Sequence, residues 1–336
     1  MLLAALPLVF FGTAWATLAL RRQARGQAPD WRGAFLAASI AWGIVVALGT
    51  ELLSIGQILT RGWLVALWST GILAGLLCMA WQWRQARGRP APPARQPVRL
   101  PRLGLALLSG IALIAAAVAL IALVSPPNNW DSMTYHLGRV VHWIQNRSVV
   151  FFPTHILRQN QQPPWSEYAV MHFMLLGGGD RLANLVQWFA MAGSVLGVSL
   201  IARELGADWR GQLLAAVFAV SLPMGVLQGA STQNDYVLAF WLVCFVFFLL
   251  PFVRRGPVSQ AMLLAMSASL ALALLTKATA YVYAFPFAAV FGWVQLRAVG
   301  GRAWLSAAVV MVVVVLLVNG GHYWRNISLF GLPLGF

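Results

Sequence analysis

Residues 103–124 read LGLALLSGIALIAAAVALIALV, without one charged side chain. A hydrocarbon core of about 30 Å is crossed by roughly 20 residues of α-helix, and the backbone polar groups there must bond within the segment because water is absent. This stretch therefore predicts a membrane-spanning helix. Comparable apolar stretches recur along the chain. They predict about ten spans, near residues 2–20, 33–50, 63–81, 103–124, 181–202, 211–228, 235–252, 260–276, 280–296 and 304–320.

The composition agrees with a chain that lies mostly in lipid. Of its 336 residues, 60% are hydrophobic and 9% are charged, whereas soluble domains carry about 25% charged residues. The net charge of +15 would favour nucleic acid as the partner of a soluble protein. Here the basic residues lie in short loops between spans, where positive charge sets orientation. We therefore expect an all-α, polytopic transmembrane helical bundle that does not bind nucleic acid.

The N-terminal segment has two interpretations. Residues 1–16 resemble a signal peptide that ends in Ala14-Trp15-Ala16. They lack a basic leading region, however, and Arg21 and Arg22 follow them as a stop signal. We favour an uncleaved first span.

Basic residues divide unequally between the two sets of loops. Sixteen of the 23 lie in residues 21–32, 82–102, 203–210, 253–259 and 297–303. Because cytoplasmic loops carry the excess of Arg and Lys, these loops are predicted to be cytoplasmic and the N-terminus to lie outside. The outer face then receives all five histidines and five of the eight acidic residues. We expect a multi-pass protein of the bacterial inner (plasma) membrane whose active site lies on the periplasmic or extracellular face.

Three parts are predicted along the chain. Residues 1–82 form three leading transmembrane helices, and residues 83–102 form a Pro- and Arg-rich cytoplasmic linker. Residues 103–336 form the core, which contains one long outer loop, residues 125–180.

The outer loop is predicted to begin with an amphipathic surface helix. Asn128 or Asn129 can cap it, and Trp130 and Trp143 suit the headgroup region. One stripe of this helix is polar and the opposite one is apolar. The polar stripe holds Asp131, Tyr135, Arg139 and His142, and the apolar stripe holds Met133, Leu137, Val140, Val141 and Ile144. The alternative interpretation is a connector whose polar face is only solvated.

Residues 151–173, FFPTHILRQNQQPPWSEYAVMHF, place amide, charged and aromatic side chains close together. These groups commonly hold sugar hydroxyls and ring faces, although Gln-rich loops often bind nothing. The candidates for substrate contact are Arg158, Gln161, Gln162, Trp165 and Glu167.

Three charged residues lie at predicted span ends. Asp235 is either the N-cap of the seventh span or a carboxylate that faces an aqueous cavity and meets a partner there. Lys277, the only lysine, and Arg325 either snorkel to the interface or contact an anionic phosphate.

The order of these motifs carries a family resemblance. WDSMTYH opens the outer loop, QNDYVLAFW begins a later span, LTKATAY follows the next one, and RNISLFGLP comes after the last. This order resembles the integral-membrane GT-C glycosyltransferases, particularly bacterial relatives of the protein O-mannosyltransferase and lipid A aminoarabinose transferase group. The resemblance covers about residues 103–336, and the three leading spans look like an addition.

The resemblance implies roles for the charged residues. Asp131 would be the general base or a metal contact, Asp235 the second acid, and Lys277 and Arg325 would face a lipid-linked phosphate. Two departures are that Ser132 follows Asp131 where such enzymes often have a second acid, and that the chain ends at Phe336, where relatives usually continue. We therefore expect the sequence to be either a fragment or a minimal version of such an enzyme. A fragment would lack either C-terminal helices or a C-terminal soluble domain.

The predicted function is transfer of a sugar from a polyprenyl-phosphate donor to a lipid, glycan or protein acceptor. Asp131 would accept a proton from the attacking hydroxyl, while Lys277 and Arg325, with Arg158, would stabilise the departing phosphate. The substrate contacts would come from Tyr135, His136, Arg158, Gln161, Gln162 and Glu167. A divalent metal at Asp131, Asp235 and a histidine is an option that no ligand spacing indicates. The alternative function is a transporter or lipid-binding scaffold, against which stands the scarcity of ionisable residues within the spans.

Overall fold

The computed structural model describes residues 2–23, 28–87, 100–255 and 259–335, and every regular element in them is helical. Both long apolar helices and short helices occur. The long helices are α1 (Leu6–Gln23), α2 (Trp31–Ile55), α3 (Arg61–Ala86), α4 (Arg102–Val124), α8 (Leu185–Glu204), α11 (Asp235–Arg255), α12 (Gln260–Thr276) and α13 (Ala280–Phe330). The shorter elements are η1 (Leu2–Ala5), η2 (Ser132–His136), α5 (Leu137–Asn146), α6 (Arg158–Gln161), α7 (Trp165–Gly177), α9 (Trp209–Val220) and α10 (Pro223–Gln228).

The protein is an all-α polytopic bundle with seven candidate membrane spans among the described residues. Two shorter apolar helices, α9 and α12, lie beside these spans. The 51-residue α13 is bent at Gly300, whose φ of 78° and ψ of 169° are not helical. Its two limbs run side by side, and the hydroxyls of Tyr281 and Tyr323 hydrogen-bond between them. The two limbs of α13 thus correspond to two of the predicted spans.

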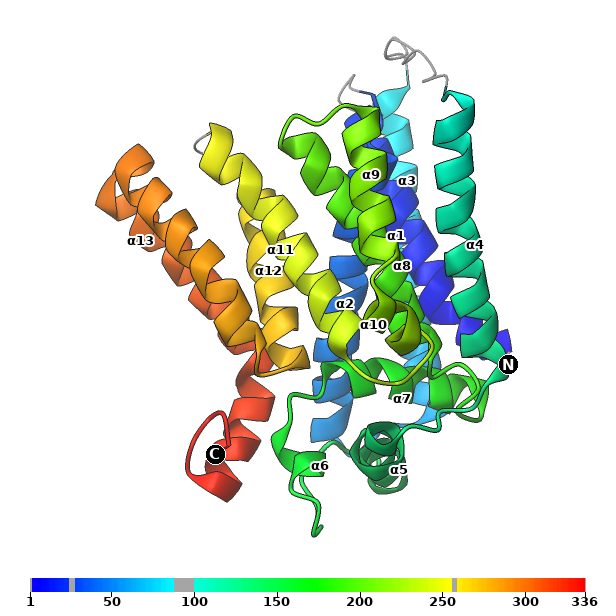
Figure 1. The fold of residues 1–336 in the computed structure, drawn as a ribbon. Helices are drawn as coiled ribbons and strands as arrows, with labels where there is room; N and C mark the ends of the chain where they lie inside the picture. The colour runs from blue at the N-terminus through cyan, green and yellow to red at the C-terminus, as the bar shows by residue number, and fades with distance from the viewer. Residues whose placement is uncertain (1, 24–27, 88–99, 256–258, 336) are drawn as a thin grey trace.

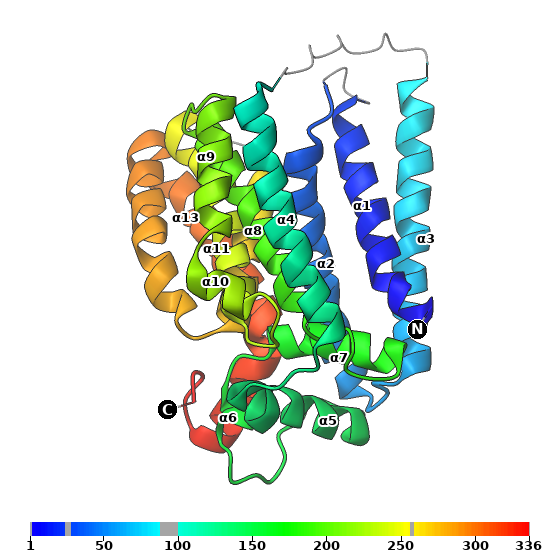
Figure 2. The same cartoon turned by 45° about the vertical axis from the view of Figure 1, so that its right-hand side comes forward.

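The two ends of the bundle differ (Figures 1 and 2). Helices α5, α6 and α7 lie together at one end, which we call the loop end, near the start of α11 and the α12–α13 connection. The end of α3 and the start of α4 lie at the opposite end. The last turns of α1, α3 and α8 there carry Arg21, Arg22, Arg84 and Arg203. The predicted charge asymmetry thus corresponds to the two ends of the molecule.

Close packing between helices holds the spans together. Gly193 and Gly197 of α8 face α11, where an added Cβ would overlap Phe240 and Val243. Small residues at such crossings let helix backbones approach closely inside a membrane. The indole N–H of Trp165 in α7 donates to the carbonyl of Gly43 in α2, at 3.0 Å. This bond joins the outer loop to a leading helix.

The predicted linker falls largely on residues 88–99, which lie outside the described residues. Of the leading helices, α2 packs against α7, α8, α12 and α13. The second helix is therefore in direct contact with the helices of the predicted core.

The outer-loop helix differs in orientation from the sequence prediction. Its cap is as expected, because the side chain of Asn129 accepts from the Ser132 backbone N–H at 2.7 Å. Trp130 is 81% exposed, but Trp143 is 2% exposed and thus wrong as a headgroup residue. In the predicted polar stripe, Tyr135 and Arg139 are buried. Arg139 is buried because α5 packs on α7, where Glu167 is its ionic partner.

Candidate active site

A buried ionic cluster fixes the start of the outer loop. Glu167 of α7 contacts the Nδ1 atom of His136 through Oε1 and lies 2.6 Å from Arg139 Nη2 through Oε2. The side chains of all three residues are at most 2% exposed. Arg139 also donates to the backbone carbonyls of Gln162 and Pro163, at 2.7 and 3.1 Å. The cluster therefore joins η2, α5, α7 and the segment before α7.

Electrostatics keep this carboxylate charged. Burial by itself would raise the pKa of Glu167, but Arg139 and His136 outweigh it and lower that pKa to about 2. A buried carboxylate that is paired with a guanidinium and hydrogen-bonded to an imidazole is stabilised as the anion. Glu167 is thus an anchor that stays ionised at ordinary pH.

Asp131 lies at the edge of the same loop and is half-buried. Within the described part of the chain, no ion pair or side-chain hydrogen bond engages its carboxylate. Its neighbour Ser132 is buried and accepts a 2.6 Å hydrogen bond from the Thr232 hydroxyl. Since Thr232 precedes Asp235 by three residues, this bond brings the segments of both predicted acids to one place.

Tyr135 lies within the electrostatic reach of Asp131. Burial raises the pKa of the Tyr135 phenol to about 12, and the charges of Asp131 and Glu167 add to this effect. The guanidinium of Arg158, from α6, lies 5.9 Å from the centre of the Tyr135 ring. A neutral phenol and a cation therefore accompany Asp131.

Asp235 and Lys277 meet directly. The Lys277 ammonium lies 2.6 Å from Asp235 Oδ1, with side-chain exposures of 31% and 44%. Asn234 strengthens the junction by donating to the carbonyl of Thr276 at 3.2 Å. The two residues that the sequence placed at separate span mouths thus form one partly exposed ion pair between α11 and the end of α12.

Arg325 has partners that the sequence analysis did not name. Its Nη1 and Nη2 atoms donate to Oε2 and Oε1 of Glu51, each at 2.7 Å. The Tyr168 hydroxyl donates to Glu51 at 2.7 Å and accepts from Arg325 Nη2 at 2.8 Å. A carboxylate directly after a predicted apolar span was the available signal for Glu51, whereas its distant partner could not be deduced.

The glutamine-rich segment has mixed roles. Gln159 and Asn160 are buried and brace the loop through bonds to Thr134 and Phe152. The side chains of Gln161 and Gln162 are partly exposed. These last two, unlike their neighbours, are available for contact with a ligand.

The predicted site residues thus form three groups at the loop end. One contains Asp131, Tyr135 and Arg158, one contains Asp235 and Lys277, and one contains Arg325 with Glu51 and Tyr168. Buried His136 and Glu167 lie behind the first group. No group of three or more His, Cys, Asp or Glu residues suited to a metal ion occurs in residues 2–23, 28–87, 100–255 and 259–335.

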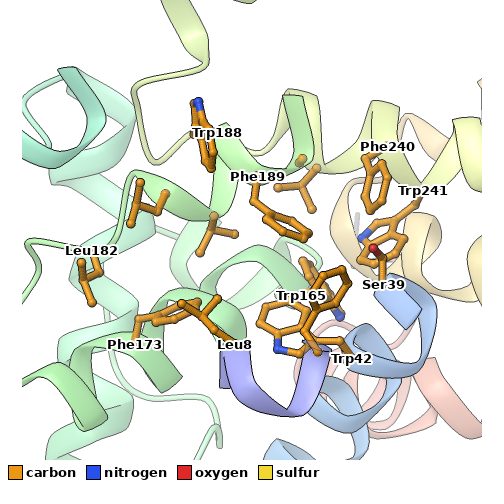
Figure 3. Close-up of a pocket in the computed structure, with 15 residues that line it drawn as sticks. Leu8, Ser39, Trp42, Trp165, Phe173, Leu182, Trp188, Phe189, Phe240 and Trp241 are labelled. Atoms are coloured by element: carbon orange, nitrogen blue, oxygen red, sulfur yellow. The ribbon is translucent and has the colours of Figure 1, made fainter. Parts of the chain in front are cut away.

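A separate apolar cavity lies among the helices (Figure 3). Its volume is about 180 Å³. The lining comes from α1, α2, α7, α8 and α11 and includes the rings of Trp42, Trp165 and Trp241. Of the predicted substrate contacts, Trp165 alone is among these lining residues. Polar chemistry therefore belongs to the loop end and not to this cavity.

Comparison with known proteins identifies the family. Residues 161–321 match the family model described as dolichyl-phosphate-mannose-protein mannosyltransferase. No curated protein and no solved structure was found to match the chain. The matched region contains Asp235 and Lys277 and ends before Arg325, and it confirms the resemblance seen in the sequence. Residues 161–321 of this multi-pass membrane protein therefore form a domain of the dolichyl-phosphate-mannose-protein mannosyltransferase type, a family of membrane glycosyltransferases that take their sugar from a lipid-phosphate-linked donor.

Proposed function

We propose that the chain transfers a sugar from a polyprenyl-phosphate donor to an acceptor at the loop end, on the periplasmic or extracellular side of a bacterial inner membrane. The acceptor would be a lipid, a glycan or a protein. The observation that carries this proposal is the Ser132–Thr232 hydrogen bond of 2.6 Å. It joins the segment of Asp131 to the segment of Asp235, whose carboxylate holds Lys277. A base, a second acid and a cation are thereby supplied to one region.

In the proposed reaction, Asp131 is the general base. Its carboxylate is half-buried and, among the described residues, free of ion pairs, so it is available to a substrate hydroxyl. It takes the proton of the acceptor hydroxyl as the oxygen attacks the anomeric carbon and the bond to the phosphate oxygen breaks. General-base catalysis typically contributes about 10²–10⁴ in rate.

Lys277 is proposed to meet the phosphate of the donor. It is 31% exposed and is held by Asp235 through one of its three N–H groups. The remaining donors are available to phosphate oxygens, on which negative charge grows as the sugar leaves. Asp235 then orients the cation, and Arg325 is proposed as the second one.

Substrate positioning is proposed for Tyr135, Arg158, Gln161 and Gln162, which surround Asp131 or follow it in the loop. His136 and Glu167 were predicted as substrate contacts from the sequence. Their exposure of 2% instead supports a positioning role, in which they hold η2 against α7.

The topology proposed for this function has ten crossings with the N-terminus outside. Among the described residues, seven helices are long and apolar enough to cross a membrane. The short α9 and α12, together with the second limb of α13, would supply three more. Orientation rests on the excess of arginine in the loops opposite the loop end. Reporter fusions at Gln96 and Asn160 should lie on opposite sides, with Gln96 cytoplasmic; the same side for both would contradict this topology.

The decisive experiment is a transfer assay with Asp131→Asn in lipid vesicles that contain a polyprenyl-phosphate sugar. Asparagine keeps the shape of aspartate but accepts no proton, so we expect a loss of about 10²–10⁴ in turnover. Asp180→Asn, at an exposed acid of the same outer loop, should behave as the unchanged chain does. An Asp131→Asn variant with more than about a tenth of normal turnover is incompatible with a general base. Transport of labelled lipid or sugar without any transfer would instead favour the transporter.

A further inference from the structure

The Glu51 carboxylate occupies an unusual position for a charged group. It lies in α2, one turn before this helix ends at Ile55, and α2 is a candidate membrane span. A charged side chain is costly at the centre of a span and less so near its end. Such residues therefore need a partner and are typically functional. Glu51 also lies outside the region matched by the family model.

Both oxygens of Glu51 are used by one guanidinium. Arg325 donates from Nη1 and Nη2 at 2.7 Å, in a fork-to-fork arrangement. The exposures of the Arg325 and Glu51 side chains are 13% and 16%. Phosphate and carboxylate are recognised by the same edge of arginine, in the same bidentate geometry. Glu51 therefore covers the edge of Arg325 on which a phosphate would bind.

The returning limb of α13 is shaped to admit this carboxylate. Gly321 lies one helical turn before Arg325, and a Cβ on Gly321 would overlap Glu51 Oε2. An alanine there would push the carboxylate away, because its end is the flexible part of the contact. The glycine thus permits the Glu51–Arg325 contact.

One donor of Arg325 is still unused. Its Nε atom is buried and has no hydrogen-bond partner among the described residues. A buried N–H without a partner is unfavourable, so a ligand oxygen that reached it would be favoured.

We propose that Glu51 is an internal anion that occupies the phosphate position on Arg325 while the donor is absent. It is a positioning residue that sets donor affinity, since the donor phosphate must exchange with it. This proposal rests on the proposed role of Arg325 at the phosphate. It adds a leading helix, α2, to the donor site.

The test compares two variants that free Arg325 in different ways. Glu51→Gln removes the negative charge and keeps the shape, whereas Gly321→Ala keeps both charges and displaces the carboxylate. For both variants we expect tighter binding of decaprenyl phosphate in detergent micelles, about tenfold for Glu51→Gln and less for Gly321→Ala, and a lower KM for the donor. Because an ion pair is weakened, the melting temperature should fall at the same time.

If Glu51 serves stability alone, the expected result differs in binding and not in melting temperature. Both variants would then lower the melting temperature but leave the Kd for decaprenyl phosphate and the donor KM unchanged or raised. That result would overturn the proposal. Arg325→Met separates this failure from a failure of the proposed function. If Arg325→Met weakens the binding of decaprenyl phosphate but Glu51→Gln does not tighten it, only the role of Glu51 is rejected. Unchanged binding in Arg325→Met rejects the assignment of Arg325 to the phosphate, and the role of Glu51 with it.

Discussion

Two ion pairs at the loop end of this protein involve similar groups in different surroundings. Glu167 and Arg139 are almost fully buried, 2.6 Å apart, and bond further to His136 and to backbone carbonyls. Asp235 and Lys277 are also 2.6 Å apart but are 44% and 31% exposed. A buried pair is expensive to break because one charge is left without water or partner. An exposed pair contributes little to stability and keeps donors free for a ligand. The difference in burial distinguishes the anchor of the loop from its candidate reactive groups.

The largest effect on stability is expected from breaking the buried pair. Arg139→Met should lower the free energy of unfolding by about 3–5 kcal/mol, because Glu167 would remain buried without its strongest partner. Thermal unfolding in detergent measures the change. The control is Arg181→Met, which removes an exposed arginine of the same loop and should shift the transition only slightly. Equal shifts in the two variants would remove the distinction between the pairs.

Acid should weaken the buried pair in a defined range of pH. The pKa of Glu167 is about 2 in the folded protein against an ordinary value of 4.5, so its contribution to stability is complete above about pH 4.5 and is lost as the pH falls toward 2. The shift corresponds to about 3 kcal/mol at 1.36 kcal/mol per unit. Glu167→Gln should abolish this part of the acid dependence in unfolding measured between pH 3 and 7. If stability depends on pH in Glu167→Gln as it does in the unchanged chain, other groups cause the acid dependence.

For the exposed pair we expect a large effect on activity and a small effect on stability. Lys277→Met is expected to reduce kcat/KM for the lipid-linked donor at least tenfold, which corresponds to about 1.4 kcal/mol, while changing stability by no more than about 1 kcal/mol. Lys277→Arg should retain part of the activity, because the charge remains but its geometry changes. Full activity in the methionine variant would mean that Lys277 only extends to the membrane interface and does not contact the donor phosphate.

A smaller effect tests the connection between the two acid-bearing segments. Thr232→Val removes the donor to Ser132 and should cost about 1 kcal/mol of stability. If the bond aligns Asp131 with the Asp235–Lys277 pair, turnover should fall more than stability does. Ser231→Ala provides the matched control, because its hydroxyl bonds locally to the Gln228 carbonyl. A transfer assay together with thermal unfolding compares the two variants.

Much of the fold was predictable because the membrane imposes simple rules. The apolar run at residues 103–124 predicted α4, which spans Arg102–Val124, since a segment in lipid must satisfy its own backbone. The sequence also predicts separate spans on the two sides of Gly300, where α13 bends. The orientation of the outer-loop helix was harder to predict. Its pattern gave a polar stripe, but the pattern cannot tell solvent from a buried partner such as Glu167.

By itself, the sequence determined the helical class, the separation of charge between the two ends, and the candidate residues Asp131, Asp235, Lys277 and Arg325, because each follows from local composition and order. Only the tertiary structure decided the pairing. It joined Asp235 to Lys277 across 42 residues and Glu51 to Arg325 across 274. A charge near lipid needs a countercharge, but the helix that supplies it depends on how the spans pack, and no local pattern records that choice.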